Sequence, residues 1–180
     1  RLTDTVEMAC KTAMIISRHL MEYNLECDYI YGVPEGATKL AIAANIYMAG
    51  GWQQGGAAIL KPRTKLVIGR SHPKEHGDIV DRNFIGPIAA GDRIIILEDV
   101  TTSGGSMLKQ IPVLLESGII ISGGISLVNR SFEKIAIARN GVTISKFFSI
   151  LDARDIMPQV FERLKPSADI IRAVSQELWP

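Results

Sequence analysis

Residues 93–106 read Arg-Ile-Ile-Ile-Leu-Glu-Asp-Val-Thr-Thr-Ser-Gly-Gly-Ser, and this stretch decides the fold. Its apolar run, Ile94–Leu97, is typical of a strand that is buried on both faces of a parallel sheet. Two carboxylates, Glu98 and Asp99, follow the run directly. A turn rich in hydroxyl groups and glycines comes next and leads into a helical pattern over Gly105–Ser117. We therefore expect a buried strand, a polar turn and a helix in succession.

The rest of the chain alternates in the same way. Apolar spacing and turn residues predict helices over residues 3–23, 37–48 and 132–139 and in the tail, and strands near 28–33, 57–60, 66–68, 124–128 and 143–150. Between residues 70 and 90 the apolar periodicity disappears, which predicts a long loop, and such loops are often functional lids. Strands alternating with helices predict an α/β fold, with a mostly parallel sheet flanked by helices. No linker divides the chain, so we expect a single domain over residues 1–180.

Composition excludes several classes of protein. The 180 residues include 20 Lys and Arg against 19 Asp and Glu, a net charge of +1. This balance argues against a broad basic surface for nucleic acid or for an anionic membrane. No apolar run approaches the roughly 18 residues of a membrane span, and the start of the sequence has no signal layout. Cys10 and Cys27 form no disulfide framework. We therefore expect a cytoplasmic protein.

The turn after the acidic pair has the chemistry of a phosphate site. Glycines let backbone amides close on a ligand, hydroxyl groups add donors, and the amino end of a helix favours negative charge. Carboxylates beside such a turn suit sugar hydroxyls, which donate hydrogen bonds to them. An ordinary helix cap after a strand would not need the acids. The sequence predicts a ribose 5-phosphate pocket formed by Glu98, Asp99, Val100, Thr101, Thr102, Ser103, Gly104, Gly105 and Ser106.

Three segments together resemble a known family. Residues 94–106 resemble the phosphoribosyl diphosphate (PRPP) signature of type I phosphoribosyltransferases, in which a hydrophobic strand runs into two acids and a Thr-rich loop. Residues 70–77, Arg-Ser-His-Pro-Lys-Glu-His-Gly, resemble the mobile catalytic loop of orotate phosphoribosyltransferases. Residues 126–130, Ser-Leu-Val-Asn-Arg, resemble the strand of that family that ends in an orotate-contacting arginine. The chain is thus similar to orotate phosphoribosyltransferases over most of residues 28–150.

The resemblance implies an activity and a fold. It implies transfer of phosphoribosyl from PRPP to orotate, giving orotidine 5′-monophosphate and diphosphate in pyrimidine biosynthesis. It also implies the type I phosphoribosyltransferase fold with a long mobile loop, a homodimer, and PRPP and orotate as ligands. Mg²⁺ is expected as the cofactor, because diphosphate is highly charged, and it would be held mainly by ligand oxygens. Neither nucleic acid nor a membrane is expected as a partner.

The resemblance also implies roles for particular residues. Glu98 and Asp99 would hold the ribose hydroxyls, and residues 101–106 would cradle the 5-phosphate. Thr102 and Arg130 match the family positions that contact orotate, and the planar fork of an arginine suits a carboxylate. The other residues would lie around the diphosphate: Arg70, Lys74 and His76 as catalytic residues of the loop, and Glu35 and Gly36 in the binding turn.

The chain departs from the family pattern at three places. Ser71 and Gly36 stand where the family has basic residues, and both changes remove positive charge from the leaving-group side. The aromatic and Ser-Gly base contacts of the family's N-terminal hood are not visible before residue 28. These departures concern the base and the leaving group more than the phosphoribosyl group.

Other functions stay open at this stage. A phosphoribosyltransferase for a purine or another pyrimidine would share the same PRPP signature. A non-catalytic PRPP-sensing regulator would share it too, but it would be expected to carry a degenerate loop and an added DNA-binding domain. His72 and His76 have a spacing that could bind zinc on a helix, yet Pro73 disfavours a helix and no third ligand stands out. Residues 70–77 could also be a solvated loop without function.

Overall fold

A four-stranded parallel sheet forms the centre of the structure, a computed structural model that describes residues 5–50, 64–131, 137–139, 142–144 and 146–179. Strand order across the sheet is β1-β4-β5-β8. The strands are β1 (Tyr29–Gly32), β4 (Arg93–Thr101), β5 (Ile120–Asn129) and β8 (Phe147–Asp152). Strands β4 and β5 are the inner pair, which confirms the expectation of a buried strand in a parallel sheet.

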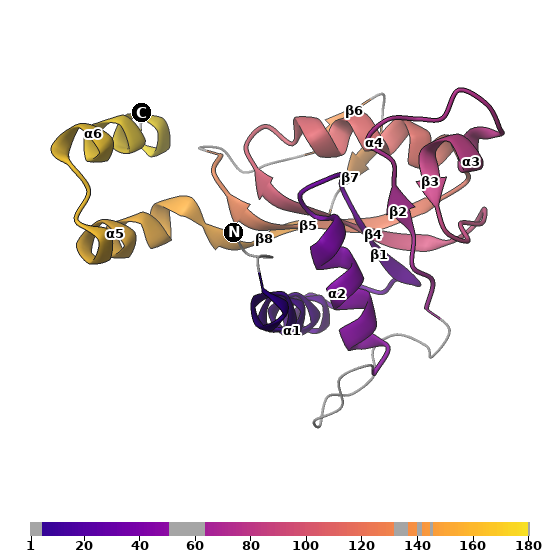
Figure 1. Cartoon of the computed structure of the whole chain (residues 1–180), viewed down its shortest axis with the longest axis horizontal. Helices are drawn as coiled ribbons and strands as arrows, with labels where there is room; N and C mark the ends of the chain where they lie inside the picture. The colour runs from indigo at the N-terminus through magenta and orange to yellow at the C-terminus, as the bar shows by residue number, and fades with distance from the viewer. Residues whose placement is uncertain (1–4, 51–63, 132–136, 140–141, 145, 180) are drawn as a thin grey trace.

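Helices cover both faces of this sheet. Helices α1 (Val6–Glu22) and α2 (Thr38–Met48) lie on one face and α4 (Gly105–Glu116) on the other (Figure 1). Side chains alternate along β4, so Ile95 and Leu97 join the core with α1 and α2, whereas Ile94 and Ile96 pack against α4. This division between two cores explains why the run is apolar at every position. It also confirms the predicted α/β architecture.

One buried amide binds the backbone of strand β1. Among the described residues β1 pairs with β4 alone, so the backbone groups of Ile30 that face away from β4 have no strand partner there. Asn45 of α2, which is 2% exposed, donates to the Ile30 carbonyl oxygen and accepts from its N–H, both at 2.8 Å. The amide therefore satisfies both backbone groups of Ile30 and ties α2 to β1.

The segment predicted as a structureless loop contains regular structure. Strand β2 (Ile68–Gly69) pairs antiparallel with β3 (Phe84–Ile85), and α3 (Ile79–Asn83) lies between them. Arg70 N–H donates to the Asn83 carbonyl at 2.7 Å, so residues 70–83 form a loop whose two ends are hydrogen-bonded to each other. The prediction of an unstructured stretch over residues 70–90 was wrong because Asp78 caps a short helix, accepting from the Asp81 N–H at 2.8 Å.

Two further predictions differ from the structure near residue 140. Strand β6 (Ile137–Arg139) pairs antiparallel with β7 (Val142–Ile144), so the helix predicted over residues 132–139 was wrong at 137–139. The Asn-Gly sequence at 140–141 is the strongest short signal for a hairpin, and it outweighs the helical pattern. The strand predicted over 143–150 is divided between β7 and β8. The strand predicted over 57–60 and the first part of that helix lie outside the described residues.

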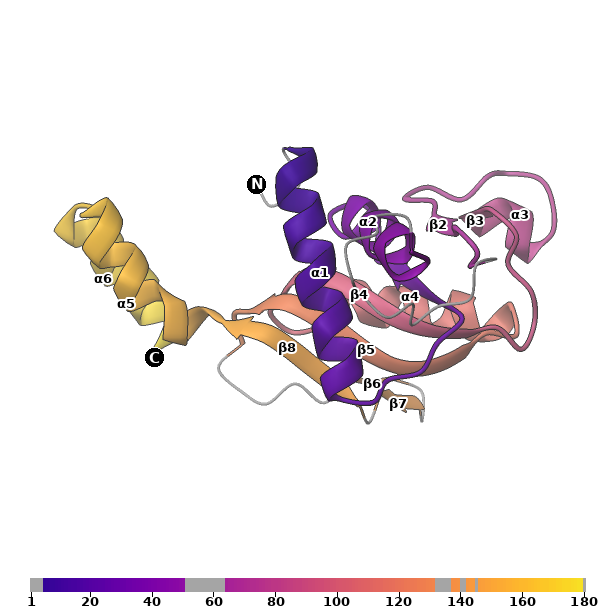
Figure 2. The ribbon, with the colours of Figure 1, turned by 90° about the horizontal axis from the view of Figure 1, so that it is seen from below.

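The helical tail extends beyond the end of the sheet. Asp152, the last residue of β8, caps α5 (Ala153–Leu164) by accepting from the Arg154 N–H at 2.9 Å. A second helix, α6 (Ala168–Leu178), follows, and both helices lie away from the sheet faces (Figures 1 and 2). None of the helices in the described ranges is long and apolar enough to cross a membrane.

Candidate active site

The carboxyl ends of three neighbouring strands meet at one edge of the sheet. Val33 N–H, just after β1, donates to the Leu97 carbonyl of β4 at 2.8 Å. Arg130 N–H, just after β5, donates to the Thr101 carbonyl at the same distance. These bonds bring together the turn after β1, the polar turn after β4 and the predicted base-contacting arginine. Ligands of open α/β sheets bind at such an edge.

Glu98 faces the α4 side of the sheet and is held there. It is 5% exposed, and Thr101 Oγ donates to its Oε2 at 3.0 Å. Burial raises the pKa of Glu98, and hydrogen bonds from Thr101 and Ser106 lower it in part. Because a strand alternates its side chains, the next residue must face the other way. The two acids predicted to act as a pair therefore lie on opposite faces of β4.

Asp99 lies against the turn that follows β1. A Cβ atom built on Gly36 would come within 2.3 Å of Asp99 Oδ2, so only glycine leaves room for this carboxylate. Asp99 Oδ1 accepts from the Val100 N–H at 2.9 Å, which fixes the other oxygen's direction. The peptide bond that joins Pro34 and Glu35 in this turn is cis. The sugar-binding acid and the diphosphate turn predicted from the sequence are thus in direct contact.

The polar turn leaves the amino end of α4 open. Thr102 and Ser103 are exposed, and Gly104 adopts a φ of 72°, a left-handed conformation that favours glycine. Gly104 is the N-cap residue of α4 and offers no side-chain cap to its first turn. The free N–H groups of that turn can therefore serve an anion. Hydroxyl groups, glycines and a helix end lie together as the sequence predicts for a phosphate cradle.

A pocket of about 430 Å³ lies beside the turn after β1. It is lined by Glu35, Thr38, Lys39, Ile68, Gly69, Arg70, Ser71, His72 and Ile85. The structure thus brings two predicted site residues, Glu35 and Arg70, to the same cavity. Arg70 Nε is buried and has no hydrogen-bond partner among the described residues. A buried guanidinium donor without a partner is a place where an anion can be bound.

Lys74 and His76 are not part of this pocket lining. Both are exposed on the loop of residues 70–83, between β2 and β3. The backbone of Lys74 is anchored to α3, because its N–H donates to the Arg82 carbonyl at 2.9 Å and its carbonyl accepts from Arg82 Nε at 3.1 Å. The structure therefore brings Arg70 to the site and leaves the other two loop residues apart from it.

The base side of the site contains contacts that the sequence did not predict. The Arg130 guanidinium pairs with Glu177 of α6. Behind it, Asn129 Nδ2 donates to Asp152 Oδ2 at 3.3 Å, and Arg154 donates to both oxygens of Asp152 at 2.9–3.0 Å. These hydrogen bonds from Arg154 hold the pKa of Asp152 below its usual value. The register that sets Asn129 opposite Asp152 is long-range, so no local signal could have found this cluster.

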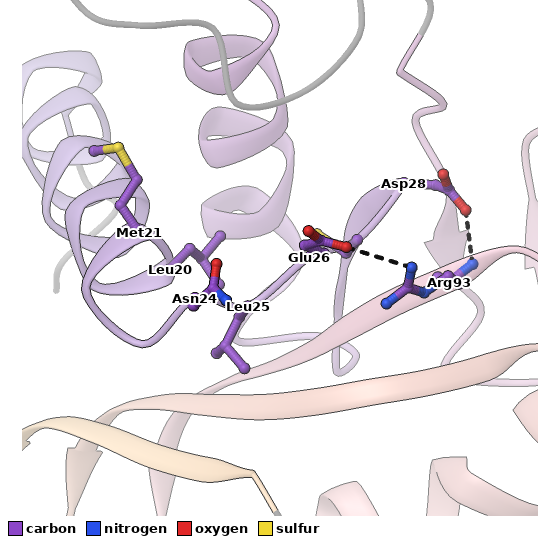
Figure 3. A pocket seen from close by; sticks show the side chains of 8 residues that line it. Leu20, Met21, Asn24, Leu25, Glu26, Asp28 and Arg93 are labelled. Carbon is purple, nitrogen blue, oxygen red and sulfur yellow. Dashed lines mark hydrogen bonds and ion pairs between the residues drawn. The ribbon is translucent and has the colours of Figure 1, made fainter.

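A second pocket of about 500 Å³ lies at the amino ends of β1 and β4 (Figure 3). Arg93 lies there between two acids, 3.6 Å from Glu26 and with its N–H bonded to Asp28 at 2.8 Å. Burial raises the pKa of the Cys27 thiol to about 12, so this cysteine is not a ready nucleophile. This pocket is at the sheet edge opposite the predicted site.

Metal ligands are sparse in the part of the chain that the structure describes. Within it, no three His, Cys, Asp or Glu side chains group to hold a metal ion. The zinc alternative at His72 and His76 therefore gains no third ligand there. Glu35 and Asp99 are oxygen donors of the kind that Mg²⁺ prefers, and they flank the same turn.

Comparisons with known proteins agree on one class of enzyme, although no family model matches the chain. The orotate phosphoribosyltransferase of Thermococcus kodakarensis is 31% identical, over 66% of this chain and 74% of the relative. That of Pyrococcus furiosus is 32% identical over 72% of this chain, which spans only 63% of the relative. The solved Mycobacterium tuberculosis orotate phosphoribosyltransferase in complex with PRPP has a TM-score of 0.56 and 15% identity, covering 87% of this chain and 80% of that one.

Proposed function

This chain belongs to the orotate phosphoribosyltransferase family, and we propose that it transfers the phosphoribosyl group of PRPP to orotate. The products would be orotidine 5′-monophosphate and diphosphate. One observation carries the proposal: Asp99 lies against Gly36, so a sugar-binding carboxylate adjoins the turn beside the basic pocket. That arrangement suits a ligand with a sugar between a phosphate and a diphosphate.

The phosphoribosyl group would occupy the turn after β4. Its 5-phosphate would accept hydrogen bonds from the exposed hydroxyl groups of Thr102 and Ser103 and from backbone N–H groups at the open amino end of α4. Asp99 would accept from a ribose hydroxyl beside the turn. Glu98 would act on the α4 side, where Thr101 and Ser106 hold its carboxylate. The acids would then bind different parts of the ribose.

The reaction requires the protein mainly to position the two reactants and to stabilise the charge that develops on them. The bond between the anomeric carbon and diphosphate breaks through an oxocarbenium-like state, and the orotate ring nitrogen forms the new bond as its proton leaves. Holding that nitrogen opposite the leaving group lowers the activation free energy by proximity. Fixed dipoles and cations around the diphosphate lower it further by stabilising the charge of the leaving group. No covalent intermediate on the protein is required.

The leaving group would lie in the pocket between the turn and β2. Arg70 has a buried donor without a partner there, and diphosphate would satisfy it. Lys74 and His76 would reach the diphosphate when the loop of residues 70–83 closes over the pocket. Closure of such loops excludes water and completes a catalytic site. Both side chains are exposed in this structure, as the proposal expects before the loop closes.

The base would be bound at the end of β5. Arg130 presents a planar guanidinium that can bind the carboxylate of orotate, and its backbone is tied to Thr101 beside the sugar site. Thr102 would contact the base from the neighbouring turn. Uracil lacks the carboxylate, so this pairing would favour orotate over uracil.

Mg²⁺ would assist by neutralising the diphosphate. The described residues build no cage of three ligands, so the ion would be held largely by PRPP oxygens. Glu35 and Asp99 would be its protein-side oxygen donors, directly or through water. The ion would supply charge stabilisation to the leaving group.

Two properties of the whole molecule form part of the proposal. We propose a homodimer, as the family resemblance implies, and the exposed Leu164, Ile170 and Trp179 of the helical tail offer apolar surface for it. We also propose a cytoplasmic location, because Cys10 and Cys27 are both free thiols, as is usual in a reducing compartment. Light scattering of the purified chain tests the first property.

A panel of bases tests the proposed substrate. The protein would be incubated with PRPP, Mg²⁺ and either orotate, uracil, adenine or hypoxanthine, and the nucleotide products would be separated by chromatography. The proposal expects a nucleotide from orotate alone. A product from a purine would instead establish a phosphoribosyltransferase for another base. PRPP binding without any product would support a PRPP-sensing regulator.

A further inference from the structure

Lys39 occupies an unusual position on the helix that borders the basic pocket. It is in the first turn of α2, where the helix dipole places partial positive charge. A lysine there is locally unfavourable, and α2 has no acidic residue in its first turn to balance it. No ion pair involving Lys39 occurs within the described part of the chain, and its side chain is exposed. Residues that break a local rule often serve a site.

The amino end of α2 has further groups that could bind an anion. Its N-cap residue is Ala37, which offers no side-chain cap, and of the first N–H groups that of Thr38 donates to the Glu35 carbonyl at 3.2 Å. Thr38 and Lys39 both line the 430 Å³ pocket, a volume within the range of roughly 300–1,000 Å³ of small-molecule sites. Arg70 lines the same pocket, and its buried Nε is without a partner among the described residues. Two cations and a helix amino end thus border one cavity.

The turn itself cannot supply this charge. Gly36 has no side chain, and one placed there would displace the Asp99 carboxylate. Glu35 adds a negative charge to the lining, which an anion would meet through a bridging cation. Among the lining residues, Lys39 and Arg70 carry the permanent positive charges.

We propose that Lys39 binds the diphosphate group of PRPP in the pocket that Arg70 also lines. This inference rests on the proposed function and adds a binding residue to it. The highly charged diphosphate would accept from the Lys39 ammonium and from N–H groups in the first turn of α2 together. The anion would also relieve the unfavourable contact between the lysine and the helix dipole.

Calorimetry with three ligands in the presence of Mg²⁺ tests the proposal: PRPP, inorganic diphosphate and ribose 5-phosphate. Lys39→Ala should weaken PRPP and diphosphate by about tenfold, the loss expected for one charge-assisted hydrogen bond. It should leave ribose 5-phosphate within about twofold, because that ligand has no diphosphate. Lys39→Arg should recover most of the affinity. Lys11→Ala, which removes an exposed lysine paired with Glu7 on α1, is the matched control and should change none of the three.

The same variants separate binding from structure. Since Lys39 opposes the helix dipole, Lys39→Ala should have a Tm equal to or above that of the wild type. A lower Tm together with equal losses for all three ligands would mean a structural role and would overturn the proposal. Unchanged PRPP affinity in Lys39→Ala would overturn it as well. If diphosphate binding depends on Lys39 but no base is converted, this inference stands and the proposed function fails.

Discussion

The contact between Gly36 and Asp99 gives the sharpest prediction about the site. Gly36→Ala adds one methyl group, and its Cβ would lie 2.3 Å from Asp99 Oδ2. The backbone of Gly36 is outside the left-handed region, so alanine fits the local conformation. The carboxylate must therefore move while the turn stays intact. Stability should change little, because Gly36 is exposed.

The size of the effect follows from what the displaced carboxylate loses. A hydrogen bond to a charged group is worth about 1.5–3 kcal/mol. Loss of the Asp99 contact to a ribose hydroxyl should therefore raise the Kd for PRPP by roughly tenfold to a hundredfold. In an Asp99→Ala background there is no carboxylate to displace. Gly36→Ala should then change the Kd by less than about twofold, giving a coupling energy of about 1.5–3 kcal/mol between the two positions.

Calorimetric titration of PRPP into the wild type, both single variants and the double variant measures this cycle. Equal losses from Gly36→Ala in both backgrounds would refute the reasoning, because the methyl group would then act on something other than Asp99. Wild-type affinity in the Gly36→Ala protein would refute it too. A lowered Tm in that variant would show that the turn, rather than the carboxylate, had been disturbed.

Three more predictions concern turnover and stability. Lys74→Ala should lower turnover at least tenfold with an unchanged Tm, since the exposed side chain is proposed to act only on the leaving group; an unaffected steady-state rate would remove Lys74 from the mechanism. Asn45→Leu should cost about 2–4 kcal/mol of unfolding free energy in urea, because both backbone groups of Ile30 lose their partner, and a loss below 1 kcal/mol would contradict this. Burial raises the pKa of Glu98, so the folded protein binds its proton more tightly, and the resulting stability is lost as pH rises through that pKa. Glu98→Gln should therefore gain stability relative to the wild type between pH 4 and pH 7; a constant difference would count against the burial argument.

The strand that carries the site could be predicted from local pattern alone. Four consecutive apolar residues at 94–97 fit only a position with two buried faces, and the cores on either side of β4 confirm it. The glycine and hydroxyl residues at 101–106 likewise predicted an open helix end. Because side chains alternate along a strand, the side chains of Glu98 and Asp99 are also expected to point to opposite faces of the sheet. The sequence pattern places both acids after the strand, whereas in the structure both lie within it.

Other parts of the site depend on contacts between distant segments. Arg70 reaches the turn after β1 only because β2 packs beside β1, which no local pattern predicts. The cluster at Asp152 depends on the register between β5 and β8. The pairing of Arg130 with Glu177 depends on where α6 lies relative to the end of β5. Asn45 left a weak signal, since it is a polar residue within an apolar helix pattern. Its role became clear only with the position of β1.

The central claim is phosphoribosyl transfer to orotate, and one coupled measurement tests it most directly. Orotate would be followed by its absorbance after PRPP is added to the protein with Mg²⁺, and released diphosphate would be counted in the same sample. We predict loss of orotate with one diphosphate released per orotate consumed, and no loss when PRPP or Mg²⁺ is omitted. Unchanged orotate and no released diphosphate in the complete mixture would contradict the account.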